Sequence, residues 1–213
     1  MISRSFITQH RLTLSFVFMC IMSYANAWFA TNFPYYEKNN PQLYDVLFQY
    51  LTPPITRNYP DVLILGLTIY FVVKYLYKNT IIASKFFFLL GTLYAFRVLI
   101  FTLTETPEPK RYQKTCSNKT TFSLANVKWF ALGTGRSCID HMFSGHALFG
   151  VSIMMFILTL SKNNLEKIVV SIATASLLIA LVWSRLHYTQ DVLIALFMTI
   201  AWSKIILGCT YFD

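Results

Sequence analysis

Apolar residues occur in long, nearly uninterrupted blocks along the chain, separated by polar connections. Six blocks are long enough to be membrane spans, at about 12–30, 61–77, 82–104, 142–160, 168–184 and 190–210. Three of these blocks run uncharged for most of a bilayer crossing, and each of the others contains a cation. The pattern predicts an all-α integral membrane protein in which residues 1–213 form a single six-span helical bundle.

The cations inside the predicted spans differ in position. Lys74, Lys85 and Lys204 lie near span ends or in spans that can tilt, so their long stems can reach the headgroups. Arg97 lies past the middle of its span, where an arginine is costly and usually faces a partner or a wet cavity. Arg97 is therefore a candidate functional residue.

The first block also has features of a secretion signal. Arg4 and Arg11 precede an apolar stretch at 14–22, and residues 25–27 read Ala-Asn-Ala, a pattern that signal peptidase cuts. The apolar character continues through residues 28–29, which favours an uncleaved first helix over a removed signal peptide.

Composition supports a membrane protein and narrows the possible partners. The chain is 55% hydrophobic and 13% charged, whereas soluble domains average about 25% charged residues. The net charge of +9 comes without a dense basic run on a soluble domain, so nucleic acid is not an expected partner. The cations are better suited to membrane topology, anionic headgroups or a phosphate-bearing substrate.

Six spans put both termini on one face and the long connections, about 31–60, 105–141 and 185–189, on the other. Lysine and arginine are densest on the face that holds both termini and the short connections 78–81 and 161–167. This distribution predicts cytosolic termini and exoplasmic long connections. Cys116 and Cys138 would then share an oxidising compartment, where they could pair or remain free thiols.

Two histidines lie where spans meet these long connections. If the last helix begins near residue 187, His187 and Asp191 are one turn apart, so the carboxylate can orient the imidazole as a nucleophile or base. His146 enters its helix after Ser144 and Gly145, and a glycine there permits close approach of an oxyanion or phosphate. Both histidines are expected on the same membrane face.

Such a set of residues is suited to phosphoryl transfer through a phosphohistidine, with arginines to hold phosphate oxygens. The alternative is a pair of interfacial histidines satisfied by ordinary hydrogen bonds. A metal site was also considered, because Cys138 and His141 lie close to the histidines in sequence. Their spacing fits no standard zinc arrangement, so neither a metal nor another cofactor is expected.

Four segments, in order, resemble the sphingomyelin synthase family, the lipid phosphotransferase branch of the type 2 phosphatidic acid phosphatase superfamily. Residues 187–192 match H-Y-T-x-D-V in full, and residues 138–147 match C-G-D-x-x-x-S-G-H-T except at two positions, isoleucine 139 and alanine 147. Residues 97–109 are similar to R-x6-T-x-L-P-x-P with a threonine replacing the leucine, and residues 41–45 are similar to P-P-L-P-D without two of its prolines.

The resemblance implies a six-span fold like that of the superfamily and assigns roles to single residues. His187 would attack phosphorus, Asp191 would orient it, and His146 would protonate the leaving alkoxide and later deprotonate the acceptor hydroxyl. Four residues are expected to bind substrate: Arg97, Asp140, Ser144 and Arg185. Arg185 is similar to an arginine of the wider superfamily, although it lies only two residues before His187, whereas five residues separate the arginine from the histidine in the superfamily.

The implied reaction moves a phosphocholine- or phosphoethanolamine-type headgroup from a glycerophospholipid donor to ceramide or diacylglycerol, without a cofactor. A lipid phosphate phosphatase that uses water as acceptor is the main alternative, since the same residues serve both reactions. A catalytically silent transporter or assembly factor is disfavoured, because the histidines are intact and no inverted repeat is visible. The site would face the lumen of the Golgi, the outside of the plasma membrane or the bacterial periplasm.

Overall fold

The computed structural model describes residues 4–32, 43–56, 58–77, 79–104 and 142–208, and these residues contain helices and no strand. The helices are α1 (Arg4–Asn32), α2 (Leu47–Tyr50), α3 (Asn58–Phe71), η1 (Val72–Leu76), α4 (Thr80–Leu103), α6 (Gly145–Leu160), α7 (Asn164–Trp183) and α8 (Thr189–Gly208). The π-helical turn η1 directly continues α3. The predicted all-α class is confirmed.

Polar residues placed just before apolar runs explain where three helices begin. The side-chain oxygens of Asn79, Ser144 and Asn163 each accept hydrogen bonds from backbone N–H groups in the first turn of α4, α6 and α7, respectively. Such N-caps satisfy donors that a helix cannot pair internally. The starts of these three helices are therefore set by residues adjacent to them in the sequence.

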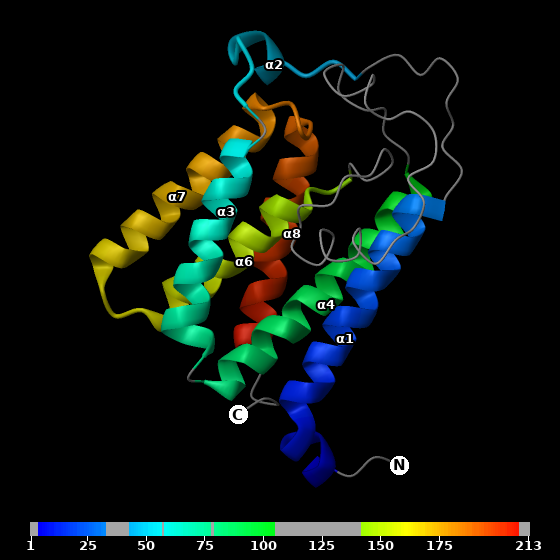
Figure 1. Ribbon diagram of the computed structural model, residues 1–213, viewed down its shortest axis with the longest axis vertical. Coiled ribbons are helices and arrows are strands. Elements are labelled where there is room, and N and C mark those ends of the chain that lie inside the picture. The colour runs from blue at the N-terminus through cyan, green and yellow to red at the C-terminus, as the bar shows by residue number, and fades with distance from the viewer. Residues whose placement is uncertain (1–3, 33–42, 57, 78, 105–141, 209–213) are drawn as a thin grey trace.

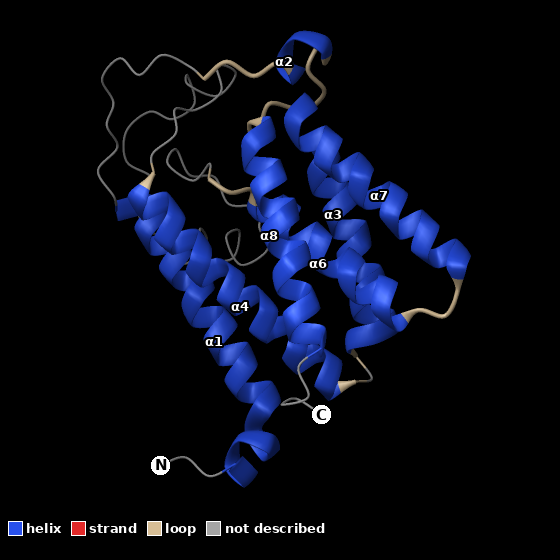
Figure 2. Cartoon of the chain, turned by 180° about the vertical axis from the view of Figure 1, so that it is seen from behind, coloured by secondary structure: helices blue, strands red, loops and turns tan. Residues whose placement is uncertain are grey.

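The long helices alternate in direction. α1, α4 and α7 run one way and α3, α6 and α8 run the other, so α1 begins at the end of the bundle where α8 finishes (Figure 1). Seen from behind, α1 and α4 form one side of the bundle, α3 and α7 form the other, and α6 and α8 lie between them (Figure 2). The starts of α3, α6 and α8 and the end of α7 therefore share one end.

Five of these units are long and apolar enough to cross a membrane: α1, α3 with η1, α4, α7 and α8. The apolar helix α6 has 16 residues, about 24 Å, which is less than the ~30 Å of a hydrocarbon core. α6 packs against α3, α4, α7 and α8, and most of its side chains are buried. Protein therefore replaces lipid around α6, and the chain is a multi-pass membrane protein.

An aromatic cluster joins three helices in the core. The ring centroids of Phe71 on α3 and Phe86 on α4 lie 4.8 Å apart, and Phe156 on α6 lies 5.9 Å from the first and 5.3 Å from the second. Tilted and edge-to-face rings at these distances are favourable arrangements. The cluster fixes α6 against α3 and α4 and thereby sets the position of the residues at the start of α6.

Candidate active site

His187 and Asp191 meet at the start of α8. The helix begins at Thr189, so His187 lies in the connection before it, slightly later than a start near 187 would place it. Asp191 Oδ2 lies 3.9 Å from His187 Nδ1 and also accepts a 3.1 Å hydrogen bond from the Tyr188 backbone N–H. This reciprocal cap holds the carboxylate in place, so Asp191 both starts the helix and faces the imidazole.

His146 lies in the first turn of α6 and faces a carboxylate from a distant helix. His146 Nε2 is 3.1 Å from Asp61 Oδ1, on the first turn of α3. Both histidines are buried, at 5% and 7% exposure for His146 and His187. Asp61 was not among the residues singled out from the sequence. The available signal was an acid, preceded by proline, at the start of an apolar span.

The two imidazole rings lie close to each other, with centroids 6.5 Å apart. The Ser144 backbone N–H donates to the Asp191 carbonyl oxygen at 3.3 Å and ties the two histidine segments together. Ser144 itself is fully buried, and its hydroxyl caps α6 by accepting from the Ala147 N–H at 3.2 Å.

Arg97 is buried on α4 and reaches the segment that enters α6. Its Nε donates to the Phe143 carbonyl oxygen at 2.7 Å, and its Nη1 donates to Asn26 Oδ1 on α1 at 3.4 Å. A Cβ at Gly145 would lie 3.4 Å from Nη1, at the edge of ordinary van der Waals contact, so the guanidinium packs directly beside Gly145. Arg97 connects α1, α4 and the start of α6 directly behind His146.

Arg185 and Asp45 connect the histidine segment before α8 to the short helix α2. Arg185 adopts a positive φ of 57°, donates from Nη2 to the Phe48 carbonyl oxygen at 3.0 Å and stacks over the Phe48 ring. Asp45 accepts from the Thr189 N–H at 2.6 Å and from the Thr189 hydroxyl at 2.8 Å. Asp45 belongs to the 41–45 segment, which is the weakest of the four motif matches. It therefore contacts Thr189, two residues after His187.

The remaining sequence candidates lie outside the described residues. Asp140, Cys138 and His141 fall within 105–141, as does Cys116. Within the described part of the chain, no group of three or more histidine, cysteine or acidic side chains is arranged to hold a metal ion. The chemistry available to the described site is that of two imidazoles, each facing a carboxylate, near the buried guanidinium of Arg97 and the half-buried guanidinium of Arg185.

Comparison with known proteins gives matches that include this site. Residues 137–206, which contain both histidines and Asp191, match the family model described as PAP2 superfamily C-terminal. Proteins named phosphatidylcholine:ceramide cholinephosphotransferase 2 from Rattus norvegicus and Mus musculus are each 28% identical over 137 residues. The Macaca fascicularis protein of the same name is 27% identical over 137 residues.

Each of these matches covers 59% of this chain and 38% of the relative, so the chain spans well under half the length of the curated relatives it matches. The family model and the relatives confirm that the chain resembles the sphingomyelin synthase family, within the PAP2 superfamily.

Proposed function

We propose that the protein is a membrane lipid phosphotransferase that works through a phosphohistidine on His187. The observation that carries the proposal is that each buried imidazole faces its own carboxylate, His187 with Asp191 and His146 with Asp61, while the two ring centroids lie 6.5 Å apart. Two oriented imidazoles on opposite sides of one phosphorus atom can serve as nucleophile and as acid–base catalyst.

In the first half-reaction, His187 Nε2 attacks phosphorus, because Nδ1 faces Asp191. The bond between phosphorus and the glycerol oxygen breaks, and His146 gives a proton to that oxygen, which releases diacylglycerol. Asp61 orients the His146 ring for this step. The product is a headgroup phosphate bonded to His187.

In the second half-reaction, His146 takes a proton from the hydroxyl of a lipid alcohol. The resulting oxygen attacks phosphorus, the bond between phosphorus and His187 breaks, and both histidines return to their starting states. If this chain uses the substrates that the names of its relatives state, phosphatidylcholine would be the donor and ceramide the acceptor. A phosphoethanolamine headgroup and a diacylglycerol acceptor fit the same residues.

Four further residues are proposed to bind the phosphate or shape the site. Arg97 supports the His146 segment from behind and can offer its guanidinium edge to the phosphate. Arg185 lies two residues before His187, and its buried Nε has no hydrogen-bond partner among the described residues, which suits a phosphate oxygen. Ser144 orders the start of α6, and Asp140 is proposed to contact a cationic headgroup.

The active site is proposed to open on the exoplasmic face. The two histidines lie at the end of the bundle opposite the start of α1 and the finish of α8 (Figure 1). The positive-inside rule favours cytosolic termini, since lysine and arginine are dense in the short segments on that side. Headgroup transfer would then take place on the lumenal, outer or periplasmic leaflet.

The test is a headgroup-labelled phosphatidylcholine donor in vesicles that contain the purified protein, with and without ceramide. We expect label to appear in a new lipid only when ceramide is present. His187→Ala, His146→Ala and Asp191→Ala should each lower turnover by about a thousandfold or more, because members of one catalytic unit fail together. Release of label into water in either condition would assign the phosphatase reaction, and full activity of His187→Ala would refute the mechanism.

A further inference from the structure

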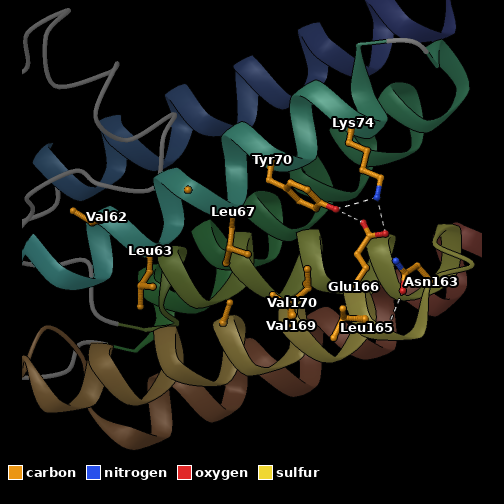
Figure 3. A pocket seen from close by; sticks show the side chains of 12 residues that line it. Val62, Leu63, Leu67, Tyr70, Lys74, Asn163, Leu165, Glu166, Val169 and Val170 are labelled. Atoms are coloured by element: carbon orange, nitrogen blue, oxygen red, sulfur yellow. Dashed lines mark hydrogen bonds and ion pairs between the residues drawn. The ribbon is translucent and has the colours of Figure 1, made fainter.

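A groove runs between α3 and α7 on the membrane-facing side of the bundle. It encloses a cavity of about 490 Å³. Figure 3 shows Val62 and Leu63 at one end and Lys74 and Glu166 at the other. The lining is mostly apolar: Val62, Leu63, Gly66, Leu67, Tyr70, Lys74, Asn163, Leu165, Glu166, Val169, Val170 and Ala173. The groove is open to the bilayer, because Val62, Leu165 and Val169 are exposed.

One end of the groove begins beside the candidate active site. Val62 directly follows Asp61, the carboxylate that faces His146. If His187 attacks phosphorus, the leaving oxygen lies in line on the opposite side of phosphorus, toward His146 and hence toward α3. The glycerol backbone and its acyl chains must therefore leave the site on the side where the groove starts.

The other end of the groove is closed by a polar cluster around Glu166, here called the Glu166 cluster. Glu166 accepts from Lys74 Nζ at 2.7 Å, from the Tyr70 and Tyr75 hydroxyls at 2.6 and 2.7 Å, and from the Ser161 hydroxyl at 2.7 Å. Figure 3 shows Lys74 and Tyr70 converging on the carboxylate. These charged and hydrogen-bonded groups mark the end of the apolar part of the groove.

The groove is long enough for one lipid chain. Val62 and Lys74 are separated by 12 residues, which corresponds to ~18 Å along a helix. The span Asn58–Leu76 that contains both is one bilayer crossing, so the groove starts below the site and ends near the opposite membrane face. An acyl chain that enters beside Val62 can therefore lie extended along the apolar wall of the groove.

We propose that this groove, which we call the α3/α7 groove, holds an acyl chain of the glycerophospholipid donor during transfer. This inference rests on the proposed function. In a bilayer the chain gains little hydrophobic free energy by moving from lipid into the groove. Its contribution is orientation: a chain held straight along α3 aligns the glycerol oxygen between phosphorus and His146.

Gly66 offers a direct test of occupancy. A Cβ at Gly66 would meet no atom of the described residues within 4 Å, so a larger side chain begins in open groove space and leaves helix packing intact. Gly66→Trp fills the groove from α3, and Val169→Trp fills it from α7. Ile69→Trp and Ile172→Trp are matched controls, because both residues are exposed on the same helices and neither lines the groove.

The kinetic measurement compares dioleoyl-phosphatidylcholine with dihexanoyl-phosphatidylcholine as donors, whose acyl chains differ in how far they can extend along the groove. We expect both groove-filling variants to lower the ratio of kcat/KM for the long-chain donor to that for the short-chain donor by about tenfold. The two control variants should stay within about twofold of wild type. An unchanged ratio in both folded groove variants would overturn the proposal.

A binding measurement keeps this inference separate from the proposed function. Phosphatidylcholine that carries a diazirine near the end of one acyl chain is photo-crosslinked to wild type and variants in vesicles, and modified peptides are mapped. We expect label on α3 and α7 around Tyr70 and Val170 in wild type and loss of that label in Gly66→Trp. If this crosslinking pattern is found but the protein shows no transfer activity, the proposed reaction is refuted and the groove as a site for an acyl chain is retained. Label spread over all membrane-facing helices would refute the groove.

Discussion

The two candidate catalytic histidines depend on carboxylates that reach them in different ways. Asp191 is four residues from His187 and belongs to the same helix start, so local geometry brings them together. Asp61 is 85 residues from His146 and meets it only because α3 packs on α6. At the scale of single residues, the His187–Asp191 pair can be predicted from a short segment of sequence, whereas the His146–Asp61 pair depends on the packing of two helices.

Asp61→Asn tests the second pair. The amide keeps an oxygen that can accept from His146 Nε2 but removes the charge, so we expect kcat to fall about 10- to 100-fold with little change in KM. In Asp61→Ala, which also removes the hydrogen-bond acceptor, kcat should be lower still. The side chain is 38% exposed, so the melting temperature should change little in either variant. A wild-type kcat for Asp61→Asn would show that His146 needs no charged partner.

The variant Arg97→Lys distinguishes two roles for Arg97, structural support of the site and direct binding of phosphate. A lysine cannot serve both the Phe143 carbonyl and Asn26 Oδ1, which the guanidinium reaches from two nitrogens. We expect lower turnover together with a loss of about 1–3 kcal/mol of stability, measured as a lower melting temperature.

Asn26→Ala combined with Arg97→Lys completes a double-mutant cycle for this contact. If the two residues act through the same contact, the double variant should lose less stability than the sum of the single variants. A lower affinity for the lipid donor with an unchanged melting temperature in Arg97→Lys would instead assign Arg97 to phosphate binding only.

At the scale of helices, glycine sets how closely neighbours approach. A Cβ at Gly91 on α4 would lie 2.5 Å from Phe18 Cδ1 and 3.3 Å from the Met19 Cα on α1, so only glycine allows the observed packing. A Cβ at Gly150 on α6 would overlap a terminal methyl group of Leu177 on α7. Small residues at such contacts are typical of helix pairs in membranes, where close packing replaces the hydrophobic effect.

Gly91→Val should push α1 away from α4 and lower stability by about 1–3 kcal/mol, as overpacking does elsewhere. Gly66→Val is the matched control, because the same side chain there meets open space and should leave the melting temperature nearly unchanged. Measuring both variants in the same detergent gives the comparison. Equal melting temperatures would mean that α1 can shift without cost, and the α1–α4 contact would not hold the bundle.

At the scale of the whole molecule, the alternating helices put the candidate site at one end of the bundle and the start of α1 and the finish of α8 at the other (Figure 1). The short helix α2 with Gln49 lies at the site end, and the α6–α7 connection with Asn163 lies at the other. This arrangement makes the orientation of the site measurable without knowing its substrate.

Single cysteines at residues 49 and 163, in a background lacking the native cysteines, should label from opposite sides of a sealed membrane. Both positions are exposed, so labelling reports sidedness and not burial. We expect residue 49 to react with an impermeant reagent added outside the cell and residue 163 to react only after permeabilisation. Labelling of both from one side would refute the six-span topology, and the reverse pattern would place the site in the cytosol.

The sequence alone determined what depends on neighbours along the chain. Apolar blocks of bilayer length predict helices, polar residues such as Asn79 and Ser144 start them, and the four-residue spacing of His187 and Asp191 puts both on one turn. The all-α membrane class was confirmed, and so was the family resemblance carried by the histidine motifs. The single-domain boundaries and the catalytic roles of the histidines stay predictions.

Only the tertiary structure decided which helix faces meet. The pairing of Asp61 with His146, the reach of Arg97 to Phe143, the contact of Asp45 with Thr189 and the α3/α7 groove all join segments far apart in sequence. The physical reason is that a membrane helix is apolar around its whole circumference. Its periodicity therefore does not mark a buried face, and close packing of particular side chains selects the partner.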